Sequence, residues 1–228
     1  MNRHLLLMLP VLFVLASCQR ARTPVERGRA VFNGFGCSSC HRIGNQGGVL
    51  GPDLTFIGFR KSKEWLGLWL KNPHGWKNNT LMPNFNLAEG TRNDLVEYLA
   101  ALRGQDFDGH RPWDAEHLAE NPIERGKVIF ARAGCVGCHG VGGVGGYPNN
   151  NVVGGQIPAL IFVADGYSKD ELKERIREGK VSDKENPKLS APMIEMPKWG
   201  EVLEEHEMDA LVEYLYSIRP AKAAGEEW

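Results

Sequence analysis

Two short segments of the chain combine a pair of cysteines with a histidine at the same spacing. They are Cys37-Ser38-Ser39-Cys40-His41 and Cys135-Val136-Gly137-Cys138-His139. The two thiols of a Cys-x-x-Cys-His motif can form thioethers with the vinyl groups of a haem, and the histidine can bind the haem iron. A zinc half-site or a redox dithiol requires only the cysteine pair, so the histidine that follows favours covalent haem. The sequence therefore predicts two haem c groups. Their attachment residues are Cys37, Cys40, Cys135 and Cys138, and their first axial ligands are His41 and His139.

The fifth cysteine, Cys18, follows an N-terminal segment of a different kind. Arg3 and His4 precede an apolar run of 11 residues, from Leu5 to Leu15. A basic start and a short apolar run are typical of a secretory signal peptide, and such a run is too short to span a bilayer. The sequence Leu15-Ala16-Ser17-Cys18 resembles the lipobox of bacterial lipoproteins. This resemblance implies that residues 1–17 are removed, that Cys18 carries the lipid, and that residues 18–23 tether the protein to a membrane. The predicted location is the extracytoplasmic, periplasmic side of the cell envelope.

The chain also contains an internal duplication around the two motifs. The segment Glu26–Phe32 (ERGRAVF) recurs as Glu124–Phe130 (ERGKVIF), and each copy starts eleven residues before the first cysteine of its motif. Further along, Leu95–Leu99 recurs as Leu211–Leu215 with the same letters, LVEYL. Two copies at this spacing indicate two similar domains rather than a solenoid of short repeats. The second copy is longer, and its glycine- and asparagine-rich segment at 140–155 is expected to be a surface loop.

Each half resembles a class I cytochrome c domain. The shared features are a helix that leads into Cys-x-x-Cys-His, a Gly-Pro-x-Leu turn, a Met-Pro segment and a C-terminal amphipathic helix. The turn is Gly51-Pro52-Asp53-Leu54 in the first half, and Ile157-Pro158-Ala159-Leu160, without the glycine, in the second. The resemblance implies an all-α fold of two tandem class I cytochrome c domains, each built around one covalent haem. We place the domains at residues 24–104 and 121–220, joined by a linker at 105–120 and followed by a tail at 221–228.

Capping residues predict where the main helices begin. Thr23-Pro24-Val25-Glu26 has the pattern of a capping box with proline at the first helical position, and Asn121-Pro122-Ile123-Glu124 repeats it. Ser62 and Ser168 are expected to start two further helices, each followed by apolar residues at helical spacing. Thr91 is the expected N-cap of the C-terminal helix of the first half.

The resemblance implies a methionine as the second axial ligand of each haem, and methionine sulfur favours ferrous iron. The resemblance points to Met82, which precedes a proline, for the first haem, whereas His74 lies outside this pattern. Two methionines compete in the second half. Met196 also precedes a proline and lies 114 residues after Met82, close to the offset of 116 between the LVEYL segments. We therefore expect Met196 as the ligand of the second haem, with Met193 as the alternative.

Charge is nearly balanced over the whole chain but not along it. The formal net charge is −1. Residues 19–105 contain 12 Lys and Arg against 6 Asp and Glu, whereas residues 106–228 contain 14 against 22. Such a dipole would orient the protein on oppositely charged partners, an effect that weakens as ionic strength rises.

These features together favour electron transfer without catalysis. The expected partners are respiratory redox proteins, such as a quinol-oxidising complex, a terminal oxidase or another cytochrome, and no nucleic acid. The chain would serve either as a carrier or as a subunit of a respiratory complex. The alternative is a dihaem enzyme such as a peroxidase, which needs one haem with an open axial site. Thiosulfate-oxidising dihaem cytochromes use a cysteine as an axial ligand, and no cysteine is left over once Cys18 and the two motifs are assigned.

Overall fold

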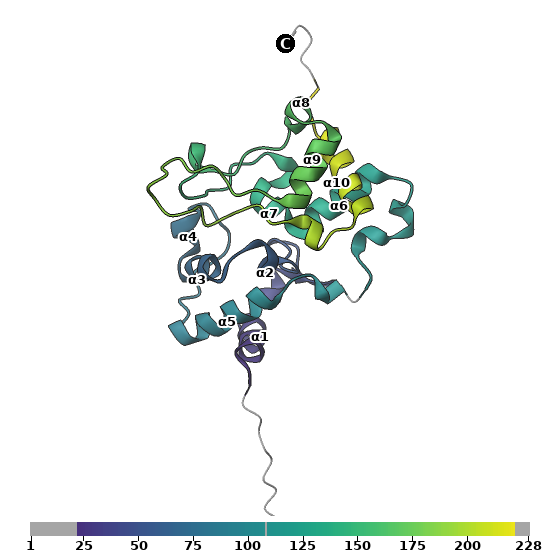
Figure 1. Ribbon diagram of the computed structural model, residues 1–228. Coiled ribbons are helices and arrows are strands. Elements are labelled where there is room, and N and C mark those ends of the chain that lie inside the picture. The colour runs from purple at the N-terminus through teal and green to yellow at the C-terminus, as the bar shows by residue number, and fades with distance from the viewer. Residues whose placement is uncertain (1–21, 108, 222–228) are drawn as a thin grey trace, which may run out of the picture.

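The computed structural model describes residues 22–107 and 109–221, and α-helices dominate it (Figure 1). The α-helices of the first half are α1 (Pro24–Gly34), α2 (Ile57–Arg60), α3 (Lys63–Lys71), α4 (Pro73–Trp76) and α5 (Glu89–Ala101). Those of the second half are α6 (Pro122–Ile129), α7 (Val136–His139), α8 (Val163–Gly166), α9 (Lys169–Glu178) and α10 (Glu205–Ser217). The predicted all-α fold is confirmed. The predicted signal peptide at 1–17, the lipidation site Cys18 and all but the first residue of the tail at 221–228 lie outside the described residues.

Short elements connect these helices. A hairpin of two antiparallel strands, β1 (Arg42–Ile43) and β2 (Gln46–Gly47), follows the first motif. A π-helical turn at Phe130–Gly134 continues α6 into the second motif. Short 3₁₀-helices lie at Cys37–Ser39, Gln105–Phe107, Pro112–Asp114, Glu116–Leu118, Val141–Gly143, Val153–Gly155 and Trp199–Glu201. Within the part of the chain that the structure describes, no helix has the length and apolar character needed to cross a bilayer.

The same helix crossing forms the frame of each half. Helix α1 packs against α5, and α6 packs against α10, and a glycine lies at each close approach (Figure 1). A Cβ added at Gly28 would lie 2.0 Å from the carbonyl oxygen of Asp94, and one added at Gly126 would lie 1.9 Å from that of Ala210. Only a residue without a side chain allows the backbones to come this close. The duplicated Glu-Arg-Gly sequence therefore encodes the same helix packing twice.

Side-chain caps start four of these helices as predicted, although the predicted capping box at Asn121 is only half formed. Thr23 and Glu26 form a reciprocal capping box at α1. The side chain of Asn121 accepts a hydrogen bond from the third residue of α6, and Ser62 and Ser168 do the same for α3 and α9. Each cap satisfies a backbone N–H that has no partner within its own helix.

The prediction that Thr91 caps α5 is wrong. The helix begins two residues earlier, at Glu89, and its N-cap Ala88 offers no side-chain hydrogen bond. An acidic residue in the first turn still favours this start through the helix dipole. Burial of Leu95 and Leu99 against the core then fixes the position of the helix.

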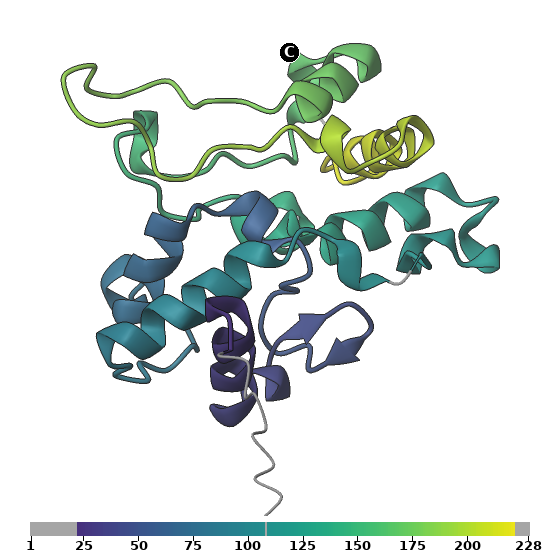
Figure 2. The ribbon, with the colours of Figure 1, turned by 60° about the horizontal axis from the view of Figure 1, so that its bottom comes forward.

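The two halves pack against each other through two shared hydrophobic clusters. Phe56 and Phe107 of the first half belong to the cluster that contains Trp199 and much of α10. Conversely, Ile157 and Ile194 of the second half belong to the cluster built around α3 and α5. The long segment between α9 and α10 extends to the side of the molecule where α4 lies (Figures 1 and 2). Each half thus helps to bury the core of the other.

The predicted linker at residues 105–120 is packed rather than extended. Trp113 is fully buried, and its indole N–H donates a hydrogen bond to the carboxylate of Glu207 at the start of α10. Arg111 forms an ion pair with the same carboxylate at 2.6 Å. Leu118 is also buried. The linker is therefore fastened to the second half and does not act as a loose spacer.

Candidate haem-binding sites

The first motif lies where α1 ends. The chain passes through Gly36, whose positive φ of 66° suits a glycine, into the tight turn Cys37–Ser39. The backbone N–H of His41 then donates to the carbonyl oxygen of Cys37 at 2.9 Å. This turn brings both cysteines and the histidine together. Cys37 is half-buried, whereas Cys40 is exposed.

The ring of His41 is oriented by the Gly51-Pro52 turn. Its Nδ1 lies 2.9 Å from the carbonyl oxygen of Pro52. Because a carbonyl only accepts, this contact places the ring proton on Nδ1 and leaves the lone pair of Nε2 for a metal. A Cβ at Gly51 would lie 2.5 Å from the imidazole, so the glycine makes room for the ring. Burial lowers the pKa of His41, against opposing effects of the Pro52 carbonyl and Asp53, and so favours the neutral form that binds metals.

The second motif repeats this geometry in a more buried setting. The Nδ1 of His139 lies 3.2 Å from the carbonyl oxygen of Pro158, the proline of the corresponding turn. Burial lowers the pKa of His139, an effect that the Pro158 carbonyl opposes and Lys61 reinforces. Burial also raises the pKa of the Cys135 thiol to about 12. Ile157 replaces the glycine of the turn, yet the histidine still meets the proline carbonyl.

The structure places Met82 beside the aromatic side chains of α3. The indole N–H of Trp69 points at the sulfur of Met82 at a distance of 2.9 Å. Trp69 also stacks on Trp65, with ring centroids 5.3 Å apart. Met82 packs against the same hydrophobic cluster as Cys37. A donor that holds a ligand atom also restricts where that atom can point. This contact between a tryptophan and the predicted ligand was not expected from the sequence.

In the second half, Met196 and Met193 have different surroundings. A cavity of about 310 Å³ is lined by Cys135, Cys138, His139 and Met196, together with apolar side chains of α9 and α10. Met193 does not line this cavity and packs against the cluster of the first half instead. Two backbone hydrogen bonds of 3.0 Å between Met196 and Lys180 set the register of the loop. The structure thus brings Met196, and not Met193, to the second motif.

The segment at 140–155, expected to be a surface loop, holds the loop that carries Met196. Asn149 is buried and exchanges two hydrogen bonds with the backbone of Ile194, at 2.8 and 3.2 Å. Asn151 donates to the carbonyl oxygen of Ser190 at 2.8 Å. An asparagine side chain has both an N–H donor and a C=O acceptor. It can therefore bond the C=O and the N–H of a backbone residue, as a neighbouring β-strand does. The three consecutive asparagines therefore position an expected ligand loop.

The two motifs differ in exposure because the first half covers the second motif. Arg60, at the end of α2, donates hydrogen bonds to the carbonyl oxygens of Asp53 at 2.7 Å and Gly134 at 3.0 Å. It thereby joins the turn beside the first motif to the residue before the second. Position for position, Cys135 is buried where Cys37 is half-buried, and Cys138 is half-buried where Cys40 is exposed. Large apolar side chains are exposed beside both motifs: Phe35, Val49, Leu50 and Leu81 near the first, and Val141 and Val144 after the second.

The side chains at both places fit a covalently held haem. In the second half, two thiols, an imidazole and the sulfur of Met196 line one apolar cavity. In the first half, Cys37 and Met82 pack against the same hydrophobic cluster, and His41 directs Nδ1 to Pro52. The buried indole N–H groups of Trp65 and Trp76 have no hydrogen-bond partner among the described residues, which suits a cofactor that carries acceptor oxygens. The groups that would hold the two haems are Cys37, Cys40, His41 and Met82, and Cys135, Cys138, His139 and Met196.

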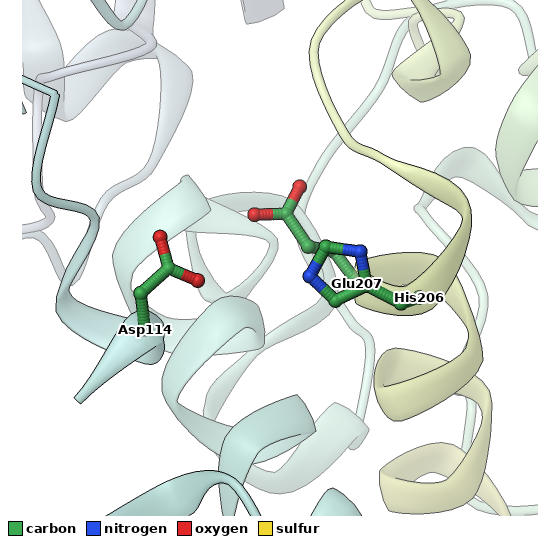
Figure 3. Close-up of side chains that lie close together, drawn as sticks. All are labelled: Asp114, His206 and Glu207. Atoms are coloured by element: carbon green, nitrogen blue, oxygen red, sulfur yellow. The ribbon is translucent and has the colours of Figure 1, made fainter. Parts of the chain in front are cut away.

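A separate cluster of Asp114, His206 and Glu207 contains groups that can bind metals (Figure 3). Its atoms already have partners. One amino group of Arg125 lies 2.8 Å from the carboxylate of Asp114 and 2.9 Å from Nε2 of His206. Arg111 and the linker tryptophan hold Glu207. Because cations and N–H donors take the positions that a metal would need, we interpret this cluster as a network that fastens the linker.

Comparison with known proteins matches both halves of the chain to one family. The family model for cytochrome c matches residues 25–103 and 123–219. A segment of 81 residues is 32% identical to the C subunit of nitric oxide reductase from Stutzerimonas stutzeri, covering 33% of this chain and 56% of that protein. A segment of 90 residues is 30% identical to cytochrome c oxidase subunit 2 of Alkalihalophilus pseudofirmus, covering 36% of this chain and 26% of that protein. The chain therefore aligns with about half of the first relative and about a quarter of the second.

A solved structure, the Kuenenia stuttgartiensis reducing HAO-like protein complex, is 19% identical with a TM-score of 0.30, over 86% of this chain and 96% of that chain. We draw no conclusion from so distant a similarity. The two family matches, by contrast, include both Cys-x-x-Cys-His motifs and both helix crossings. Proteins of this family hold haem c covalently and transfer electrons. The chain therefore belongs to the cytochrome c family and contains two tandem cytochrome c domains.

Proposed function

We propose that this chain is a membrane-anchored dihaem cytochrome that passes electrons between respiratory redox proteins and catalyses no reaction of its own. The observation that carries the proposal is the repeated histidine geometry. His41 and His139 each direct Nδ1 to a proline carbonyl and keep Nε2 free. A second site of the same design implies a second haem. The protein would act as a carrier or as a subunit of a respiratory complex.

Each part of the two sites has a defined task in this proposal. The four motif cysteines would hold the cofactors, and the two histidines together with Met82 and Met196 would bind their iron. When bound, haem c supplies reversible one-electron chemistry between ferrous and ferric iron. The chain fixes the ligands and surrounds the second site with apolar side chains that exclude water. The shared clusters join the two halves that carry the sites.

The exposed side of the first site is the contact surface that we propose for redox partners. Cys40 is exposed, and Val49, Leu50 and Leu81 in the flanking turns expose 74%, 71% and 82% of their surface. A partner can therefore approach the first site closely. Respiratory partners are supported by the relatives, which are subunits of a cytochrome c oxidase and of a nitric oxide reductase.

Haem content and ligand reactivity test this proposal. The full chain, produced in a host that attaches haem c, is expected to carry two covalent haems by mass spectrometry and by its pyridine haemochrome spectrum. Both haems should be low-spin and should bind neither carbon monoxide nor peroxide, because methionine sulfur occupies the position that these molecules need. One haem per chain would refute the dihaem proposal. A high-spin haem that reacts with peroxide would favour an enzyme such as a peroxidase.

The membrane anchor is a separate part of the proposal, supported by the lipobox-like sequence that ends at Cys18. Two acyl chains on one residue give stable anchoring where a single chain does not. Cys18→Ser is therefore expected to move the protein from the membrane fraction to the soluble extracytoplasmic fraction, with an unchanged haem spectrum. Fractionation of cells followed by haem staining measures the shift. A wild-type protein that is already soluble without detergent would contradict the anchor.

A further inference from the structure

The contact between the two halves joins two different surfaces. From the first half, Phe56 and Phe59 pack against Trp199 of the second half, with ring centroids 6.0 and 5.2 Å apart. Arg60, which ends α2, donates a hydrogen bond to the carbonyl oxygen of Gly134 at 3.0 Å. The first half thus uses α2, and the second half uses the region of its motif. Such a contact is heterologous, and it leaves one equivalent surface unused on each half.

The duplication locates the unused counterpart of the α2 surface. Helix α8 begins 106 residues after α2 and has the same length, so Phe162 corresponds to Phe56. The backbone agrees, because φ and ψ are −113° and 12° at Phe162 and −110° and 22° at Phe56. Phe56 exposes 2% of its surface, whereas Phe162 exposes 59%. Residues 162–167, which we call the α8 face, are therefore free where their counterparts are covered.

The unused counterpart of the other surface lies beside the first motif. Phe35 corresponds to Ala133, since each lies two residues before the first cysteine of its motif, and Phe85 corresponds to Trp199 in the Met-Pro segment. Ala133 exposes 0% of its surface, whereas Phe35 exposes 45%. Phe35 and Phe85 pack edge-on, with ring centroids 5.8 Å apart. We call these two rings the first motif face.

The two free faces lie at opposite ends of the molecule and in halves of opposite charge. Figure 1 shows α8 at one end and α1, which leads into the first motif, at the other. Residues 19–105 carry a net charge of +6 (12 − 6), and residues 106–228 carry −8 (14 − 22). Two copies placed end to end would therefore bring opposite charges together, whereas two like ends would repel.

The arginines that fasten the halves have no counterpart on the free faces. Gly166 stands at the position of Arg60, and Gly34 at the position of Arg132, which forms an ion pair with Asp53 at 2.8 Å. A Cβ at either glycine would meet no atom of the described structure within 4 Å. The free faces thus keep exposed aromatic rings without the arginine links. A contact of this kind suits the weak encounters through which redox proteins exchange electrons.

We propose that copies of this chain associate head to tail, with the α8 face of one copy docked on the first motif face of the next. Phe162 would pack against Phe35 and Phe85, as Phe56 packs against Trp199 within the chain. A second copy would thus occupy the surface that we assign to redox partners of the first site. The contact depends on the fold alone, whereas its use for passing electrons between copies rests on the proposed function.

Phe162→Ser and Phe35→Ser test this contact, because both rings are exposed. All samples are haem-loaded protein in which Cys18→Ser removes the lipid. At an ionic strength of about 0.01 M, sedimentation velocity should show dimers and then longer rows as the concentration rises, because a heterologous contact need not close. Either substitution should weaken the association about tenfold or more, the usual effect of losing a central aromatic side chain.

An equal mixture of the two variants distinguishes this contact from a twofold one. The Phe162→Ser variant keeps its first motif face, and the Phe35→Ser variant keeps its α8 face. The mixture should therefore regain dimers but form no longer rows. Raising the ionic strength to about 0.15 M should weaken association of the unsubstituted faces, since the Debye length falls from about 30 to about 8 Å.

Val153→Ser is the matched control, because Val153 exposes 71% of its surface in the second half but lies outside the α8 face. It should associate as the unsubstituted protein does. A protein that stays monomeric at every concentration, an effect of only one of the two phenylalanines, or a mixture that does not associate would overturn the proposal. Haem is counted in every sample. Fewer than two covalent haems refutes the dihaem proposal, whereas a monomeric two-haem protein refutes only the contact between copies.

Discussion

Met196→Ala is expected to remove about half of the sulfur-to-iron charge-transfer absorbance of the oxidised protein, because each haem has one methionine ligand in the proposed arrangement. The potential of one haem should also fall, since the lost thioether favoured ferrous iron. Carbon monoxide should then bind to about one haem per chain, at the position that the sulfur has left. Optical spectra of the ferric protein and carbon monoxide titration of the ferrous protein measure these effects.

The neighbouring methionine provides the control for this experiment. Met193 packs against the first half and does not line the cavity of the second site. Met193→Ala should therefore keep the full charge-transfer band and bind no carbon monoxide. Met82→Ala should remove the other half of the sulfur-to-iron charge-transfer absorbance, the part that remains in Met196→Ala. If Met193→Ala loses the band and Met196→Ala keeps it, the assignment of the second ligand is wrong.

Gly126→Ala is expected to destabilise the second half by ~3 kcal/mol or to prevent its folding, because overpacking a tight contact costs this much or more. The added Cβ would lie 1.9 Å from the carbonyl oxygen of Ala210 and 2.8 Å from the Cβ of Tyr214. Relief of such a clash requires α6 and α10 to move apart. Guanidinium unfolding of the haem-loaded protein, followed by far-UV circular dichroism, measures the change.

Substitutions at two other glycines provide a second test of the crossing and a control. Gly28→Ala should destabilise the first half similarly, because its Cβ would lie 2.0 Å from the carbonyl oxygen of Asp94. In α3, a Cβ at Gly67 would meet no atom of the described structure within 4 Å. Gly67→Ala should therefore stabilise the protein by up to ~1 kcal/mol, the usual gain of alanine over glycine inside a helix. Equal stability of the Gly126 and Gly67 variants would show that the crossing does not depend on glycine.

The parts of the molecule that could be predicted from the sequence are encoded by residues close together in the chain. A cap pairs a side chain with an N–H three residues later, as at Thr23, Ser62 and Ser168, so a short pattern reveals it. The Cys-x-x-Cys-His motifs and the two LVEYL segments are also runs of consecutive residues, so they can be recognised in the sequence. The family match then confirmed the two cytochrome c domains that these repeats indicated.

Contacts between distant segments carry no such pattern. Asn149 pairs with a backbone 45 residues away, and Arg60 reaches a carbonyl 74 residues away. Both residue types are ordinary for a loop and for a helix end, so nothing in the sequence marks them. The expected start of α5 at Thr91 is wrong for a related reason. Burial of the apolar face determines where this helix begins, and no side-chain cap marks its first residue. The choice between Met193 and Met196 likewise depends on pairing of Met196 with Lys180, which composition does not reveal.

The covering of the second motif by the first half has a consequence for the order of maturation. A thioether can form only when a cysteine thiol reaches the vinyl group of a haem. Cys135 is buried in the folded chain, and Arg60 is bonded to the residue just before it. Cys40 remains exposed. In a dihaem protein, we therefore expect attachment at the second motif to precede the closure of the two halves. We therefore expect docking of the two halves to follow attachment of the inner cofactor during biosynthesis.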